Sequence, residues 1–251
     1  MFQGAVRTVF PQVFPILIAK RFANGKATCQ VGGAAMMVNS DGWFVTAGHI
    51  LQEIHTLTAE TQGERRPDKG RARVTHFLPI FSSTRATLAE GLAQTGSDVG
   101  FGRLQNYPPP QGYPRFRSRP IEVGEFLCRI GFPFTKAIET TWTKEGGFVL
   151  NNPFPVPGFV NEALVSRFRK LPTGLWMETS SPGLRGQSGG PLIDTAGFVC
   201  GIQSNTAHYP LGFEKAGRNQ VLNVGRAVHV ETVTEFAKLH GIKYLTEEEE
   251  T

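Results

Sequence analysis

A serine flanked by glycines is the strongest sign of chemistry in this sequence. The letters GQSGGP occupy residues 186–191 and are followed by the apolar Leu192 and Ile193. Glycines let the backbone turn sharply, so that the Ser188 hydroxyl can point into a cleft while nearby main-chain N–H groups bind an oxyanion. The pattern favours Ser188 as a nucleophile, and a glycine-rich hairpin with a plain turn serine is the alternative.

A serine nucleophile needs a base within hydrogen-bond reach and a third group that orients the base. His49 is the one histidine of six that directly follows a strand-like segment, in TAGH at residues 46–49. Asp98 is the one aspartate of four that opens an apolar strand, Val99–Leu104, where its carboxylate could be buried and hold the imidazole Nδ1–H. We therefore expect His49 as the base and Asp98 as the acid, the alternatives being a structural histidine and a turn aspartate.

Short apolar segments must position these three residues, and they recur along most of the chain between glycine, proline or polar clusters. Such spacing predicts an all-β sandwich or barrel. The proline-rich residues 106–114 divide the segments into two groups, and helical periodicity appears only near the end, from Val230 to a closing Gly241. The expected strands are Phe14–Ala19, Gly33–Val38, Trp43–Thr46, Arg73–Phe77, Val99–Leu104, Phe126–Ile130, Gly147–Leu150, Leu175–Glu178, Pro191–Ile193 and Phe198–Ile202.

The composition excludes several classes of protein. With 251 residues, 40% of them hydrophobic and 19% charged, the chain can build a packed core and is not a disordered protein. No run approaches the roughly 18 consecutive apolar residues of a membrane span. No secretion signal is evident either, so we expect a soluble, cytoplasmic protein without a membrane partner.

The net charge of +5 is unevenly distributed. Residues 247–250 are four glutamates, which we interpret as a frayed tail, and the rest of the chain therefore carries +9. Clusters of arginine and lysine at 115–119 and 167–170 are the places where nucleic acid could bind. Because no nucleic-acid-binding motif accompanies them, we expect no nucleic-acid partner.

Metal and cofactor chemistry is not expected. Cys29, Cys128 and Cys200 have irregular spacings that fit neither a disulfide framework nor a zinc motif, and we interpret them as reduced core residues. His49 and His55, with a glutamate between them, do not have the spacing of a known zinc motif. The proposed serine chemistry needs no metal or organic cofactor.

The order of His49, Asp98 and Ser188, with the proline-rich stretch between the acid and the serine, resembles the chymotrypsin-like, or trypsin-like, serine protease family. The resemblance covers residues 14–241, and TAGH and GQSGGP are its most specific marks. IGFPF at 130–134 and AVHV at 227–230 look like the bacterial HtrA (Deg) branch. Since no sequence follows Thr251 for a PDZ domain, we expect a protease domain alone.

The resemblance implies an all-β fold of two six-stranded antiparallel β-barrels with a short C-terminal helix. We expect one domain over residues 1–251, with an N-terminal barrel at 12–105, a linker at 106–120, a C-terminal barrel at 121–230, a helix at 231–241 and an acidic tail at 245–251. The implied activity is that of a serine endopeptidase on a protein or peptide substrate. Ser188 would attack, His49 would carry the proton, Asp98 would orient the imidazole, and the N–H groups of Gly186 and Ser188 would form the oxyanion hole.

Two departures from the family pattern carry information. Gln187 replaces the aspartate that pairs with a newly cut amino terminus, so we expect no activation by amino-terminal cleavage. The enzyme would be active as made, or switched by rearrangement of residues 183–185 or by an activating protein partner. Pro182 stands where trypsin has an aspartate, and Thr206 stands in place of a glycine, so we expect cleavage after small or medium apolar residues. The substrate-binding residues would be Pro182, Gln203, Ser204, Asn205 and Thr206.

Two further hypotheses remain beside the endopeptidase. One is a catalytically silent or partner-activated protein that keeps the fold and acts by recognition. The retained Ser188 and His49 speak against it. The other is an esterase that uses the same three residues. Labelling by a fluorophosphonate separates both enzymes from the silent protein, and a peptide-library digest separates the peptidase from the esterase.

Overall fold

The structure is a computed structural model, in which residues 1–21, 27–54, 76–81, 84–85, 87–107, 109–134, 138–142, 148–150, 156–211 and 221–248 are described. The predicted all-β class is confirmed, because nearly all of the described elements are strands arranged in two sheets. Part of the expected strand Arg73–Phe77 and part of Gly147–Leu150 lie outside the described residues.

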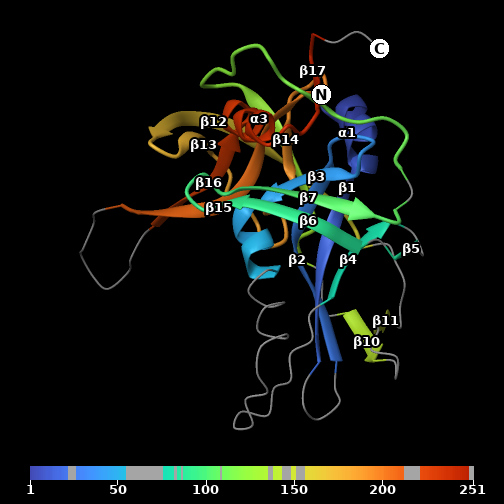
Figure 1. The fold of residues 1–251 in the computed structure, drawn as a ribbon. Coiled ribbons are helices and arrows are strands. Elements are labelled where there is room, and N and C mark those ends of the chain that lie inside the picture. Colours follow the sequence, from blue (N-terminus) through green and yellow to red (C-terminus); the bar gives the residue numbers. More distant parts are fainter. Residues whose placement is uncertain are drawn as a thin grey trace, which may run out of the picture.

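The first sheet carries the strands of the N-terminal half in the order β5-β4-β1-β2-β3-β7-β6, and Figure 1 shows them side by side. A later hairpin, β10 and β11, joins this sheet because Ile138 on β10 pairs with Cys29 on β2. No pairing closes this sheet into a ring among the strands described. The strands are β1 (Val13–Arg21), β2 (Ala27–Met37), β3 (Trp43–Ala47), β4 (His76–Phe81), β5 (Thr84–Arg85), β6 (Thr87–Gln94), β7 (Val99–Gln105), β10 (Ile138–Trp142) and β11 (Phe148–Leu150).

The second sheet closes into the expected barrel of six strands. Its order is β14-β9-β12-β13-β16-β15, and the ring is completed by antiparallel pairing of β15 with β14. Two short strands, β8 and β17, extend it through parallel pairs. The strands are β8 (Arg115–Phe116), β9 (Phe126–Gly131), β12 (Phe159–Leu171), β13 (Gly174–Thr179), β14 (Pro191–Ile193), β15 (Val199–Pro210), β16 (Val221–His229) and β17 (Leu245–Thr246).

The described helices are short. The expected C-terminal helix is α3 (Val230–Leu239), whose first turn is capped by the His229 side chain accepting a hydrogen bond from the Glu231 N–H. Two other segments are helical although the sequence pattern does not predict them: α1 (Gln3–Val9), followed by the 3₁₀ turn η1 (Phe10–Gln12), and residues 48–54, which follow β3. No described helix is long and apolar enough to cross a membrane.

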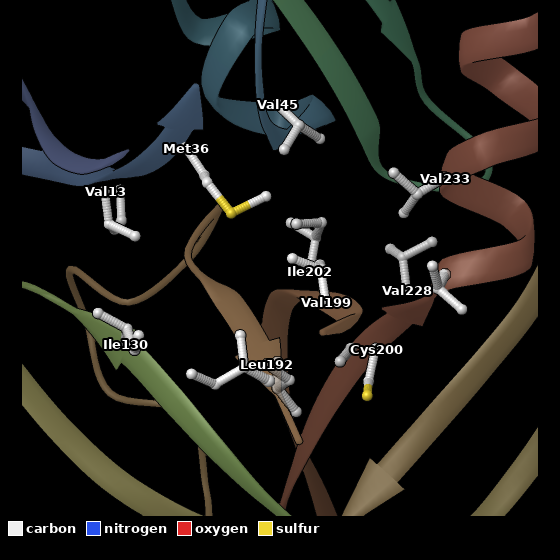
Figure 2. Packing of buried hydrophobic residues seen from close by; sticks show 14 of the residues in the cluster. Val13, Met36, Val45, Ile130, Leu192, Val199, Cys200, Ile202, Val228 and Val233 are labelled. Atoms are coloured by element: carbon white, nitrogen blue, oxygen red, sulfur yellow. The ribbon is translucent and has the colours of Figure 1, made fainter. Parts of the chain in front are cut away.

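One hydrophobic core cluster joins the two sheets. Met36 and Val45 from the first sheet face Ile202 and Leu192 from the second, as Figure 2 shows. Cys29, Cys128 and Cys200 are buried and free, which confirms the interpretation as reduced core residues. Burial raises the pKa of the Cys200 thiol to about 12, so this cysteine stays protonated and unreactive at neutral pH.

The basic clusters are largely engaged in ion pairs within the fold. Arg117 pairs with Glu125 and Asp194, and Arg119 pairs with Asp194 and with Glu247 at 3.0 Å. We expected a frayed glutamate run, but its first residue, Glu247, is held against the barrel by the ion pair with Arg119. Residues 249–251 lie outside the described residues.

A buried carboxylate ties four strands of the second barrel together. Glu178 on β13 is 2% exposed, and it accepts hydrogen bonds from Arg167 on β12 at 2.6 Å and from Arg226 on β16 at 3.0 Å. The Tyr209 hydroxyl on β15 donates to the same carboxylate. Burial raises the pKa of Glu178, but these hydrogen bonds outweigh it and lower the pKa to about 2.

We expect Glu178→Gln to lower the free energy of unfolding by about 3 kcal/mol at pH 7, because the folded state favours the ionised carboxylate. A lowered pKa stabilises the fold above the unfolded-state value, near 4.5, and this contribution is lost as the pH falls to about 2. Urea denaturation at pH 7 and pH 3 measures both effects. Glu122→Gln, at an exposed position, is the control. A loss for Glu178→Gln that did not shrink in acid would contradict the prediction.

Candidate active site

Ser188 lies on the loop before β14, where strands of both sheets meet. Its carbonyl accepts a hydrogen bond from the Ala34 N–H on β2 at 2.7 Å, and the Gly189 N–H donates to the Gln203 carbonyl on β15 at 2.7 Å. Gly189 has a φ of +87°, and a Cβ at that position would lie 2.1 Å from the Ala34 carbonyl oxygen. Glycine at 189 therefore allows Ser188 to fit between the two sheets.

His49 and Asp98 meet because β3 and β7 are paired strands. Ala47 lies opposite Val99, so the residues just after β3 and just before β7 are neighbours. The Asp98 carboxylate accepts a hydrogen bond from the His49 backbone N–H at 2.8 Å, and its two oxygens lie 3.1 and 3.0 Å from His49 Nδ1. The structure thus brings the predicted base and acid into direct contact.

The contact changes the pKa of both groups. The hydrogen bond to Asp98 raises the pKa of His49, with burial opposing and the charges of Asp98 and Glu53 adding to the rise. Burial raises the pKa of Asp98, but hydrogen bonds from His49 and Ser204 and the His49 charge outweigh it, so the pKa is lowered overall. Asp98 is therefore ionised at neutral pH, and Nδ1 carries the imidazole proton while Nε2 offers its lone pair.

Ser204 connects the acid to the serine. Its hydroxyl donates to Asp98 Oδ2, and its carbonyl accepts the hydrogen bond of the Ser188 hydroxyl at 2.7 Å. Among the residues that the structure describes, no hydrogen bond joins His49 to Ser188. In this arrangement the Ser188 hydroxyl must rotate about χ1 to reach the imidazole. Catalytic hydrogen bonds are often long or absent in unliganded active sites and form only when substrate binds.

Residues 184–187 form a type II turn beside the serine. The Gln187 N–H donates to the Leu184 carbonyl at 2.9 Å, and Gly186, at the third position, has a φ of +97°, which this turn type requires. A Cβ at Gly186 would lie 2.4 Å from the Phe132 carbonyl oxygen. Neither the Gly186 N–H nor the Ser188 N–H donates to another described residue. These are the two N–H groups that the family resemblance implies as the oxyanion hole.

Gln187 holds this turn from inside the protein. The side chain is fully buried, its Oε1 accepts a hydrogen bond from the Leu184 N–H at 2.9 Å, and its Nε2 donates to Asn161 Oδ1 on β12 at 2.7 Å. The Gln187 side-chain amide therefore links the turn to β12 by hydrogen bonds within the protein, and neither bond involves a charged group.

We expect Gln187→Leu to lower both kcat/KM and the free energy of unfolding, the latter by about 1–3 kcal/mol, because the Leu184 N–H and the Asn161 amide would lose their partners. Urea denaturation and initial rates on one peptide substrate measure the two effects. Gln105→Leu, at an exposed position on β7, should change neither. Unchanged stability and rate in Gln187→Leu would show that the buried amide does not hold the turn.

The predicted specificity residues lie where β15 contacts the turn. Thr206 Oγ1 donates to the Gly183 carbonyl at 2.7 Å, and a Cβ at Gly183 would lie 2.2 Å from Gln203 Nε2. Gln203 is buried and donates to the Asn205 carbonyl, whereas Asn205 is exposed. The hydroxyl of Ser204, another residue of the predicted pocket wall, donates to Asp98. Thr206 and Gln203 thus both lie against Gly183.

A buried arginine lies beneath Pro182, and the sequence analysis missed it. Arg129 on β9 is fully buried, and its guanidinium donates to the Pro182 carbonyl at 3.1 Å and to Thr179 Oγ1 at 2.8 Å. No described carboxylate forms an ion pair with it. Burial lowers the pKa of Arg129 to about 10, so it is still charged at neutral pH. The sequence did hold a sign of this buried charge, namely an arginine inside the otherwise apolar strand segment FLCRIG at 126–131.

Among the described residues, no group of three histidine, cysteine, aspartate or glutamate side chains could hold a metal ion.

Solved structures share the fold of this chain. The HtrA-type protease AlgW with a decapeptide has a TM-score of 0.60 at 17% identity, covering 95% of this chain and 66% of that chain. A variant form of AlgW with a tripeptide gives 0.57 at 18% identity, covering 95% and 62%. The active form of the Rv3671c protease from M. tuberculosis gives 0.54 at 16% identity, covering 96% and 86%. The chain thus spans less than two thirds of the AlgW chains.

No curated protein matches the sequence. A family match does exist, to the family described as "Trypsin-like peptidase domain", over residues 33–202. This range begins in β2, ends in β15 and includes His49, Asp98 and Ser188. Because the match covers more than half of the sequence and the fold agrees with it, the chain belongs to the trypsin-like peptidase family.

Proposed function

We propose that this chain is a serine endopeptidase that hydrolyses peptide bonds through an acyl-enzyme. Ser188 is the nucleophile, His49 the base and Asp98 the acid that orients the imidazole. The observation that carries the proposal is the contact of the Asp98 carboxylate with His49 Nδ1, with Ser204 linking Asp98 to Ser188. The two N–H groups without described partners at Gly186 and Ser188 support it.

In the proposed reaction the Ser188 hydroxyl turns from Ser204 to His49 Nε2, which takes its proton as the oxygen attacks the carbonyl carbon. The N–H groups of Gly186 and Ser188 bind the oxyanion, each lowering the barrier by about 3–4 kcal/mol. His49 then gives its proton to the leaving amine. A water molecule, deprotonated by the same imidazole, releases the acyl group from Ser188.

The proposed specificity is for a small or medium apolar residue before the cleaved bond. Thr206 and Gln203 narrow the space beside Gly183. The charge of Arg129 lies beneath Pro182, where it repels a lysine or arginine side chain. Efficient cleavage after arginine in a peptide-library digest would refute this part of the proposal.

Amino-terminal cleavage is not part of the proposed activation. Gln187 finds its partners in Leu184 and Asn161 and carries no charge with which to bind a new amino terminus. The hydrogen bond from Ser188 to Ser204 favours a second candidate, a resting form in which a protein partner must turn the Ser188 hydroxyl to His49.

A fluorophosphonate probe tests the proposal, with mass spectrometry to locate the label and a peptide-library digest to establish endopeptidase activity. We expect one label, on Ser188, and cleavage inside peptides. Label without any peptide cleavage would indicate an esterase. Absence of label from the folded protein would contradict the active enzyme and leave the partner-dependent form as the alternative.

A further inference from the structure

An aromatic ring from the N-terminal segment, residues 1–12, packs beside the oxyanion turn, residues 184–187. Phe10, the first residue of η1, is half-buried and packs against the core cluster that joins the two sheets. Its ring centroid lies 6.1 Å from that of Phe132, at an interplanar angle of 53°. Phe132 directly follows β9 and is 3% exposed. The N-terminal segment thus reaches the second barrel through this aromatic pair.

Glycine at 158 makes room for the Phe10 ring. A Cβ at this position would lie 2.1 Å from Cζ of Phe10, far closer than an ordinary carbon contact of about 3.5–4.0 Å. Gly158 comes just before β12, whose first residue, Phe159, pairs with Gly131 at the end of β9. The Phe10 ring therefore contacts both the start of β12 and the residue that follows β9.

The backbone of Phe132 connects this packing to the turn. Its N–H donates to the Gly186 carbonyl at 3.0 Å, and its carbonyl oxygen would lie 2.4 Å from a Cβ on Gly186. Gly186 carries one of the two N–H groups proposed for the oxyanion hole. Such a donor acts at about 2.7–3.1 Å from the developing charge, so a small shift of the turn weakens its effect. The position of Phe132 therefore bears on the position of this donor.

The helix before Phe10 is itself anchored in the protein. Ala5 and Val9 on α1 are buried in the same core cluster. A Cβ at Gly197, in the turn between β14 and β15, would lie 3.5 Å from Cα of Ala5 and 3.7 Å from Cγ2 of Val9. Since Phe10 directly follows Val9 in the chain, these contacts hold its backbone against the second barrel.

We propose that Phe10 is a positioning residue for the peptidase reaction, whose ring keeps Phe132, and through it the Gly186 N–H, in place to bind the oxyanion. The inference rests on the proposed function and adds to it a residue that acts through Phe132 and not on the substrate. Like the hydrogen bonds of Gln187, the contacts that carry it involve no charged group.

Removing the ring is expected to impair transition-state binding more than substrate binding. Phe10→Ala should lower kcat on a peptide substrate about tenfold, less than the hundredfold or more that follows when an oxyanion donor is removed outright. The KM should change by less than about twofold, because the interaction is made only in the transition state.

A peptide trifluoromethyl ketone measures the oxyanion site itself. Ser188 Oγ forms a bond to its carbonyl carbon, the Ser188 proton passes to His49, and the carbonyl oxygen takes the negative charge beside the Gly186 and Ser188 N–H groups. Its Ki should rise about tenfold in Phe10→Ala. The Ki of the matching alcohol, which forms no bond to Ser188, should stay unchanged.

Two further variants test the contact from opposite directions. Phe10→Leu refills much of the space between Gly158 and Phe132 and should keep most of the wild-type kcat. Gly158→Ala adds a methyl group where the ring lies, so it should displace the ring and lower kcat as Phe10→Ala does. The double variant Phe10→Ala, Gly158→Ala should lose no more than either single variant, because both changes act through one contact.

Phe2→Ala is the matched control, because Phe2 is another half-buried ring of the N-terminal segment that packs against the same core cluster. It should lower the melting temperature about as much as Phe10→Ala does. The kcat and the Ki of the trifluoromethyl ketone should stay at their wild-type values.

Wild-type kcat and Ki in Phe10→Ala would overturn the inference and leave the proposed function intact. Equal losses in Phe10→Ala and Phe2→Ala would do the same, because they would show a general loosening of the protein. If the wild-type protein neither cleaved peptides nor took up the fluorophosphonate on Ser188, the proposed function and this inference would fail together.

Discussion

Replacing Ser188 with alanine is expected to lower kcat for peptide hydrolysis by about a millionfold, the size of loss observed when the serine of a comparable triad is removed. Alanine removes the oxygen that forms the acyl-enzyme but keeps the backbone. The contacts of the Ser188 carbonyl with Ala34 and of Gly189 with Gln203 should therefore be retained. We expect KM and thermal stability to stay close to those of the wild-type protein.

Initial rates on a peptide substrate and fluorophosphonate labelling measure this loss. Ser166→Ala, at an exposed position on β12, is the matched control and should keep full activity. If Ser188→Ala kept more than about one per cent of the wild-type kcat, another group would carry the reaction and the assignment of Ser188 would be wrong.

Asp98→Asn should lower kcat by about ten-thousandfold, because a neutral amide neither fixes the Nδ1–H tautomer nor stabilises the imidazolium that forms during attack. The change should also move the pH profile. Catalysis needs neutral His49, so wild-type activity is lost as the pH falls through the His49 pKa, which Asp98 raises above 6.5. Without Asp98 the pKa falls, since burial opposes the charged form, and the acid limb of the residual activity should shift to lower pH.

A profile of kcat/KM between pH 5 and pH 9 measures this shift. Asp41→Asn replaces an exposed turn aspartate and should leave both the rate and the profile unchanged. A full loss of activity with an acid limb that stayed in place would show that Asp98 does not set the pKa of His49. A melting temperature close to wild type would separate this result from misfolding.

Local sequence was sufficient to single out the three candidate residues. Each stands at the end or start of an apolar segment, His49 after β3, Asp98 before β7 and Ser188 before β14. Small residues around each of them mark a turn where a side chain can leave the strand. The same local patterns located most of the strands and the amphipathic helix α3, because alternation and helical periodicity are properties of neighbouring residues.

Elements with weak local patterns were not predicted. Residues 48–54 are helical, with Gly48, Ile50, Leu51 and Ile54 buried, and so short a helix depends on its tertiary contacts. Much of β12 and the first three residues of β16 are exposed, so they lack the apolar segments by which strands were recognised. Only the end of β16, in AVHV at 227–230, was expected as a strand from the family resemblance.

The sequence by itself determined the all-β class, the candidate His49, Asp98 and Ser188, and the family. Tertiary structure alone decided how their side chains meet, because Ser204 joins Asp98 to Ser188 by hydrogen bonds. It also decided that Gln187 links the oxyanion turn to Asn161 on β12. It also placed the charge of Arg129 beneath Pro182. The physical reason is that these contacts join residues distant in the chain, through strand pairing and burial, which no local pattern records.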